Sequence, residues 1–253
     1  MEHLDIGNRI KHNYENASKT RLLRRTPVAI RLDGRAFHTF TRHLRKPFDD
    51  IFMKTMQETM RYLCSQIQGC VFGYTQSDEI TLILIDYQEL NTDAWFDYEV
   101  QKLCSISASL ATYAFHKYFD IHTDNYFSMY ADEDPAYENV LYKACHTCAA
   151  FDARCFNIPK EEVANLIYWR QLDAKRNSVQ MCGQAEFSQN ELHEKTCEDI
   201  KAMLPYSWDN LPAAKKWGSA CYRTKAEKWF VDFHMPLIKG ENRKYVEQWV
   251  MLE

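Results

Sequence analysis

The chain has 253 residues and a formal net charge of −4, and 46% of its residues are hydrophobic. This size and composition suffice for a full core in one large domain or two closely packed ones, and they exclude a disordered chain. No apolar stretch approaches the roughly 20 residues that span a membrane, and the segment 1–9 is too polar and charged for a signal sequence. We therefore expect a cytoplasmic protein with no membrane partner.

In chain order, the first part of the sequence predicts five elements: a basic helix over 9–25, a strand over 27–32, a helix over 49–65, and paired strands over 70–75 and 80–85. Asp49 or Asp50 is suited to cap the second helix. The rest predicts a long helix over 93–118, a polar loop over 132–135, β-like chain over 140–158, a helix over 159–184, a shorter helix from Ser188 that ends before Pro205, β-like runs such as 229–233, and a closing helix from Asn242.

This order predicts an α+β fold. Its centre is a polymerase-type palm, a β-α-β-β unit in a ferredoxin-like antiparallel sheet with flanking helices, followed by a helical and β C-terminal extension. We expect a palm-like catalytic domain with a basic N-terminal helix over 1–158, and a C-terminal region over 159–253.

Positive charge is concentrated near the N-terminus. Residues 11–46 contain ten basic and two acidic residues, which gives this segment +8 and leaves −12 for the rest of the chain. Such asymmetry suits a face that binds polyphosphate or nucleic acid, with Arg24 and Arg25 as candidate RNA contacts. The alternative is a solvated charged face that binds nothing.

Nine cysteines in a chain without an export signal indicate reduced thiols. The segment 145–148 reads Cys-His-Thr-Cys, and Cys155 follows nearby, so the residue types for zinc are present. A single CxxC without a second matched pair is weak evidence for such a site. The sequence leaves metal binding here open.

Three acidic residues occupy places where phosphate chemistry would need them. Asp33 ends the apolar run 28–32, and Asp78 and Glu79 lie between two predicted strands. Carboxylates at a strand end and in a hairpin turn can converge on divalent metal, and Asp33 and Asp78 can each bridge two Mg²⁺ ions for in-line phosphoryl transfer. Gly34 would let the backbone turn sharply and present its carbonyl and the following amides to a triphosphate. Glu79 would add negative charge or orient a ligand.

Each acidic site also has a purely structural interpretation. Asp33-Gly34 is a common turn pair, and Ser77-Asp78 is suited to a hairpin turn. Their joint occurrence inside a basic segment and its neighbouring hairpin is much more specific than either alone. Nucleotide chemistry is therefore the leading hypothesis.

Several strings of residues extend this hypothesis: Ile30 to Phe40 (IRLDGRAFHTF), Lys46 to Asp49 (KPFD), Tyr74 to Glu79 (YTQSDE), Gln101 to Leu103 (QKL), Phe151 to Arg154 (FDAR) and Tyr168 to Asp173 (YWRQLD). On these strings the chain resembles the tRNA-histidine guanylyltransferase family, including its template-dependent branch of 3'-5' RNA polymerases. The resemblance covers most of residues 5 to 180.

The resemblance implies specific roles. Asp33, the Gly34 carbonyl and Asp78 would bind two Mg²⁺ ions, with Asp33, Asp78 and Glu79 as the catalytic acids. The expected nucleotide contacts are Gly34, Arg35, Ala36, Phe37, His38, Lys46, Asp49, Ser77 and Lys102. Further RNA contacts are expected from Arg170 and Asn177, although Arg170 with Asp173 has the spacing of a structural ion pair. His38 and Lys46 also have interpretations without a ligand. His38 could be a hydrogen-bonded core or surface histidine, and Lys46 a solvated lysine.

One departure from the family separates its two activities. Where guanylyltransferases dedicated to histidine tRNA carry a His-Ile-Asn-Asn-Leu-Tyr-Asn-like string, this chain reads Lys-Arg-Asn-Ser-Val-Gln-Met over 175–181. The resemblance therefore implies activation of a tRNA 5'-monophosphate with ATP or GTP, followed by templated addition of nucleoside triphosphates to the 5' end by a homotetramer. The alternatives are untemplated G addition to histidine tRNA, a palm-type nucleotidyl cyclase and a noncatalytic RNA-binding module.

Overall fold

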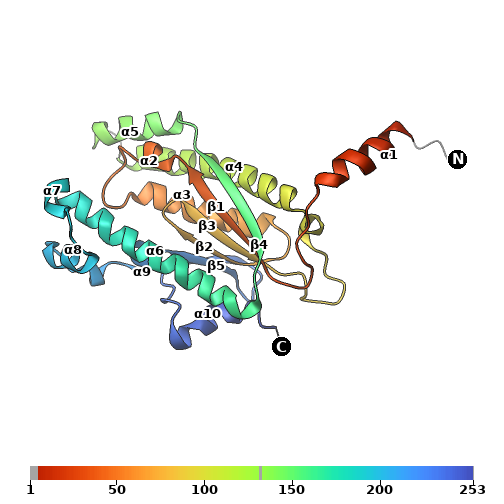
Figure 1. The fold of residues 1–253 in the computed structure, drawn as a ribbon. Coiled ribbons are helices and arrows are strands. Elements are labelled where there is room, and N and C mark those ends of the chain that lie inside the picture. The colour runs from red at the N-terminus through yellow and green to blue at the C-terminus, as the bar shows by residue number, and fades with distance from the viewer. Residues whose placement is uncertain (1–4, 131–132, 253) are drawn as a thin grey trace.

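Six antiparallel strands form one sheet in the order β4-β1-β3-β2-β5-β6 (Figure 1). The computed structural model of the protein describes residues 5–130 and 133–252. The strands are β1 Val28–Arg35, β2 Cys70–Gln76, β3 Glu79–Leu84, β4 Ala150–Asn157, β5 Ser219–Arg223 and β6 Trp229–Asp232. The first three lie where the alternation of apolar residues predicts them.

Two long helices connect the first four strands. α3 (Asp50–Gln66) joins β1 to β2, and α4 (Val100–Tyr130) leads from β3 toward β4. With the strand order β4-β1-β3-β2, this is the β-α-β-β-α-β arrangement of a ferredoxin-like palm. The predicted fold class is confirmed. So is the helix cap, because the Asp49 side chain accepts a hydrogen bond from the Phe52 amide.

The sheet is covered on both faces, which explains the continuous apolar runs in its central strands. Val28, Ile30 and Leu32 point toward α3 and α4, whereas Ala29 packs in a second core against α6 (Lys160–Glu186). α3 and α4 lie on one side of the sheet and α6 crosses the other (Figure 1). The first core also holds a group of phenylalanine rings that anchors the chain just after β1.

The N-terminal helix differs from the prediction of 9–25. It begins as α1 (Ile6–Ile10), continues through a π-turn over Lys11–Glu15 and a 3₁₀ turn over Asn16–Ser18, and ends there. The following residues are extended because their backbone bonds to the body of the protein: the Leu22 amide donates to the Tyr98 carbonyl, and the Leu23 amide to Asn157. α1 itself extends away from the sheet (Figure 1).

The connection from β3 to β4 also differs from the prediction. A left-handed 3₁₀ turn at Trp95–Tyr98 precedes α4, so that helix begins at Val100 rather than 93, and it continues to Tyr130 rather than 118. The predicted β-like chain from 140 is wrong at its start, because α5 (Pro135–Cys145) is helical. Asp134 caps α5 by accepting from the Tyr137 amide, a signal that the sequence carries.

The C-terminal region contributes short helices and two strands. These elements are α7 Gln189–Leu192, α8 Cys197–Met203, a 3₁₀ turn over Trp208–Asn210, α9 Ala213–Trp217, a 3₁₀ turn over Gly240–Arg243, and α10 Lys244–Glu247. The single helix predicted after Ser188 is α7 and α8, each with its own capping box. β5 pairs with β2, so this region extends the palm sheet. Within the described parts of the chain, every helix is too short or too polar to span a bilayer.

Candidate functional site

The main chain brings Asp33 and Asp78 together. Asp33 lies opposite Glu79 where β1 pairs with β3, and the Gly34 amide donates to the Asp78 carbonyl at 3.1 Å. Ser77, with a φ of 48°, and Asp78 form the tight turn between β2 and β3. The strand end and the hairpin turn therefore meet at one edge of the palm, as the sequence predicts.

Both carboxylates titrate above their ordinary range. Burial raises the pKa of Asp33, and the negative charges of Glu79 and Asp152 raise it further, against the opposing effect of nearby arginines. Burial also raises the pKa of Asp78, to which the charge of Asp33 adds. Two adjacent carboxylates that repel each other in this way are stabilised as anions by a bound cation.

The donor set at this edge fits Mg²⁺. Over residues 5–130 and 133–252, no group of three or more His, Cys, Asp or Glu side chains could bind a metal ion. Mg²⁺ needs no such cage, because one or two carboxylates suffice when water and substrate phosphates complete its coordination. Asp33, Asp78 and the Gly34 carbonyl supply hard oxygen ligands of this kind.

The residues of the Cys-His-Thr-Cys motif and Cys155 all lie in the described chain, and they form no such group of metal ligands. Cys145 ends α5, and burial raises the pKa of its thiol to about 11. Cys155 lies in β4, with its sulfur 3.6 Å from that of Cys104 and a pKa raised by burial to about 12.

Glu79 is buried and paired with two arginines. Its carboxylate accepts from Arg170 at 2.6 and 2.7 Å and from Arg31 at 3.0 Å. Arg170 also binds Asp173 at 2.8 Å, so the Arg-Asp pair anticipated on α6 is present. These contacts attach α6 to the edge of the sheet. The catalytic role of Glu79 and the RNA contact of Arg170 stay predictions beside this structural role.

The loop after β1 turns at Ala36 rather than at Gly34. Gly34 is part of the extended strand β1, and Ala36 has the left-handed φ of 56°. Glycine is needed at 34 for space, because a Cβ there would lie 2.4 Å from the Phe37 ring. Phe37 begins the short helix α2 (Phe37–Phe40) and is buried among four other rings: Phe40, Phe52, Phe115 and Phe151. Arg35 and His38 remain exposed.

A cleft with a cavity volume of about 70 Å³ lies between the start of α3, the β2–β3 turn, α6 and α9. Of the predicted residues, Ser77, Asp49 and Asn177 line it, and Lys46 lines an adjoining part with Ser77 and Asp49. The other lining residues are mostly apolar, and include Phe48, Phe52, Met53, Ala174 and Met181. Ser77 joins this cleft directly to Asp78.

Two lysines that line the cleft were not predicted from the sequence. Lys215 and Lys216 of α9 line it, with Lys215 paired to Asp50 at 3.2 Å and Lys216 donating to the Asp209 carbonyl at 2.7 Å. The only local signal is a basic pair next to Trp217. Their place in the site depends on the pairing of β5 with β2, which brings α9 beside the hairpin turn.

Asp49 has a full set of hydrogen bonds within the protein. Besides the Phe52 amide at 3.0 Å, it accepts from the Arg45 amide at 3.0 Å and from the Tyr137 hydroxyl at 2.6 Å. The carboxylate thus shapes the wall of the cleft and fixes the loop that carries Lys46. Its predicted place beside a nucleotide base stays a prediction.

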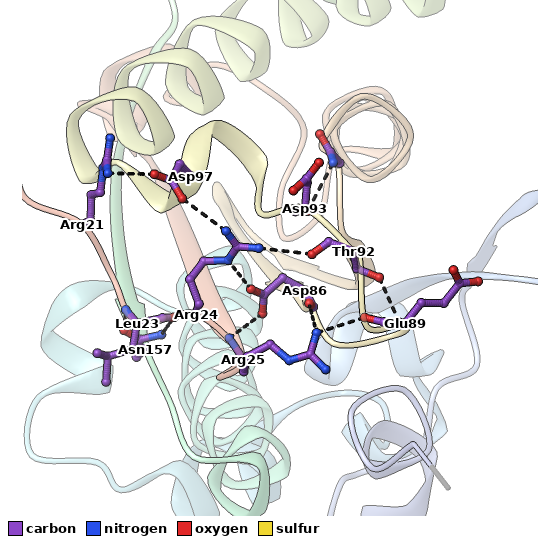
Figure 2. Close-up of polar contacts among 11 residues, drawn as sticks. Arg21, Leu23, Arg24, Arg25, Asp86, Glu89, Thr92, Asp93, Asp97 and Asn157 are labelled. Carbon is purple, nitrogen blue, oxygen red and sulfur yellow. Dashed lines mark hydrogen bonds and ion pairs between the residues drawn. The ribbon is translucent and has the colours of Figure 1, made fainter.

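Arg24, Arg25 and Lys102 lie away from the cleft, and the predicted contacts Gly34, Arg35, Ala36, Phe37, His38 and Arg170 are likewise absent from its lining. Figure 2 shows Arg24 bound to the buried carboxylate of Asp86 at 2.6 Å and to Asp97, and Arg25 bound to the same Asp86 through its amide. Lys102 lies near the start of α4, 5.4 Å from the Phe96 ring. The arginines tie the N-terminal segment to the end of β3, which is a structural role; their RNA contacts stay predictions.

Comparison with known proteins gives consistent matches. The sequence profile of the family described as tRNAHis guanylyltransferase matches residues 7–159. A bacterial tRNA(His) guanylyltransferase-like protein in complex with ATP is 36% identical, covers 98% of this chain and 100% of its own, and superposes with a TM-score of 0.83. The same kind of protein in complex with GTP is 35% identical over 98% and 100% of the chains, with a TM-score of 0.76. A probable tRNA(His) guanylyltransferase of Dictyostelium discoideum is 26% identical over 89% of this chain and 86% of its own.

Proposed function

Because this chain belongs to the tRNAHis guanylyltransferase family of nucleotidyltransferases, we propose that it adds nucleotides to the 5' end of tRNA in the 3'-5' direction, templated by the opposite strand. The 5'-monophosphate attacks the α-phosphate of ATP or GTP and releases pyrophosphate. The 3'-hydroxyl of the incoming nucleotide then attacks the activated 5'-phosphate and releases AMP or GMP. The observation that carries this proposal is the junction of the Asp33–Asp78 pair with an apolar cleft at Ser77.

The cleft has the composition that a nucleotide needs. Phe48, Phe52 and Met181 offer an apolar wall for a base, and the Asn177 amide offers hydrogen bonds to its edge. Lys46 and Lys216 place positive charge where a triphosphate would extend toward Ser77. Relatives bind ATP and GTP, and both are proposed as activating nucleotides here.

Asp33, Asp78 and the Gly34 carbonyl would bind two Mg²⁺ ions. Mg²⁺ bound there would neutralise phosphate charge and lower the pKa of the attacking hydroxyl. Phe37, buried among aromatic rings, fixes the main chain that carries the Gly34 carbonyl. Glu79 and Arg170 hold α6, and with it Asn177, against the edge of the sheet. These contacts preorganise the site before the substrate arrives.

Templated addition is favoured over untemplated G addition to histidine tRNA. The support is the string over 175–181. It differs from the His-Ile-Asn-Asn-Leu-Tyr-Asn-like string that guanylyltransferases dedicated to histidine tRNA carry at this place. Within it Ser178 bonds to Trp208 at 3.0 Å and Val179 packs in a core with Ile200. A homotetramer in the cytoplasm, in which several subunits share one tRNA, completes the proposal, since a net charge of −4 gives one chain little positive surface.

The test uses a 5'-monophosphorylated tRNA that lacks its first nucleotide, with ATP, all four nucleoside triphosphates and Mg²⁺, followed on a sequencing gel. We expect addition of the nucleotide complementary to the opposite strand. Equal G addition whatever the opposing base would favour the untemplated reaction, and a product formed from triphosphate alone would favour a cyclase. If the protein bound RNA without any 5' addition, and Asp33→Asn did not change that binding, the protein would be a noncatalytic RNA-binding module.

A further inference from the structure

A large aromatic side chain is open to solvent near the acidic pair. Trp169 of α6 is 51% exposed. The guanidinium groups of Arg31 and Arg170 lie 5.2 and 4.5 Å from the centre of its ring. Because both guanidiniums also bind Glu79, they lie together at the protein side of the indole. The ring is thus held in place by cation–π contacts while half of the residue stays accessible.

The ring stands over the same face of the sheet as the acidic pair. Side chains two residues apart on a strand point to one face, so Arg31 shares its face with Asp33. In the neighbouring strand β4, Arg154 lies opposite Arg31; its side chain is 55% exposed and pairs with the exposed Asp152 at 3.3 Å. This face therefore combines an exposed aromatic ring, an exposed cation and Asp33.

α6 connects this ring to the cleft. Trp169, Asp173 and Asn177 follow each other at intervals of four residues and so share one side of the helix. Asn177 lines the nucleotide cleft. With a rise of about 1.5 Å per residue, the ring lies about 12 Å along the helix axis from Asn177, a few nucleotide spacings along a strand of RNA.

We propose that Trp169 is a stacking platform for an unpaired nucleobase at the end of the RNA substrate, with Arg154 binding an adjacent phosphate. The inference rests on the proposed function and adds to it a binding site outside the nucleotide cleft. Exposed aromatic rings beside cations bind single-stranded nucleic acid in this way, since every base has a face that stacks.

The experiment measures binding and stacking separately. The probe is a 5'-monophosphorylated tRNA in which 2-aminopurine replaces one terminal unpaired or template base, a different position in each sample. The fluorescence of 2-aminopurine is quenched when it stacks. A dye attached far from this end gives the Kd by fluorescence anisotropy. Trp169→Ala is expected to weaken RNA binding by roughly 5- to 150-fold and to abolish the quenching at one position. Trp169→Phe should restore both in large part, and ATP affinity should not change.

Tyr113→Ala is the matched control. Tyr113 is 57% exposed on α4, which covers the opposite face of the sheet, so its removal should leave RNA binding unchanged. Trp169→Leu retains an apolar side chain without a ring and serves if the alanine variant does not fold.

The inference is overturned if folded Trp169→Ala or Trp169→Leu binds RNA with the affinity and quenching of the wild type. It is also overturned if these variants change the oligomer mass in sedimentation, because Trp169 would then belong to a contact between copies of the chain. Failure of the wild type to bind any tRNA would instead refute the proposed function itself, and the two failures are thereby distinguished.

Discussion

The hydroxyl of Tyr137 lies 2.6 Å from a carboxylate oxygen of Asp49, and this bond joins α5 to the start of α3. The same tyrosine ring is covered by the Arg45 guanidinium at 3.8 Å, which also binds Asp134 at 2.9 Å. The loop that carries Lys46 to the cleft is therefore fixed from a helix that contributes nothing to the cleft itself. Preorganisation of the proposed nucleotide site therefore depends on α5.

Tyr137→Phe removes only the hydroxyl and tests this link. A buried carboxylate that loses one donor costs about 1.5 to 3 kcal/mol, so we expect a loss of this size in the free energy of unfolding and weaker ATP binding. Denaturant titration and calorimetry measure the two. Tyr142→Phe, on an exposed residue of the same helix, is the control. Equal loss in both variants, or none in Tyr137→Phe, would contradict the link.

The buried ion pair between Arg170 and Glu79 makes a second prediction. Arg170→Met leaves the Glu79 carboxylate with Arg31 alone, and removal of one partner of a buried pair costs about 3 to 5 kcal/mol. We expect a loss of this size in denaturant titration. Arg176→Met, which removes an exposed arginine of the same helix paired to Asp173, should cost little. If Arg170→Met instead lowered tRNA affinity without loss of stability, Arg170 would be an RNA contact.

Asp33→Asn and Asp78→Asn test the acidic pair. Loss of an anionic metal ligand removes several kcal/mol of charge stabilisation, so we expect 5'-end addition to fall by roughly 10³-fold or more while tRNA affinity is kept. Asp120→Asn, on the exposed side of α4, should retain activity. Wild-type activity should be abolished by EDTA and restored by Mg²⁺. Activity that survives both substitutions would assign the pair a structural role.

His122 makes the protein sensitive to acid. Burial lowers the pKa of this imidazole, with help from the charge of Lys54 and against that of Glu58. The unfolded chain therefore binds a proton at higher pH than the folded one, and stability falls as pH drops from the ordinary histidine value of about 6.5 through the lower folded pKa. His122→Gln should lose less stability than wild type between pH 8 and pH 5. The exposed His193→Gln should follow the wild type, and identical curves for all three would contradict the prediction.

Much of the palm could be predicted from local sequence. The apolar alternation of β1, β2 and β3 and the Asp49 cap of α3 require only neighbours along the chain, and they place Asp33 and Asp78 at the sheet edge. The N-terminal segment could not be predicted in this way. Its basic residues favour a helix locally, but from Lys19 onward Leu22 and Leu23 bond to the body, and Arg24 binds Asp86.

The sequence by itself determined the fold class and the acidic pair, because strand periodicity, turn residues and capping act over a few positions. The family followed from the resemblance of its motif strings. The tertiary structure alone decided what surrounds that pair. Lys216 enters the cleft through the pairing of β5 with β2, Gly34 is required by the packing of Phe37, and Glu79 is neutralised by Arg170 from 91 positions along the chain. Contacts at such separations depend on how whole elements pack, which no local pattern specifies.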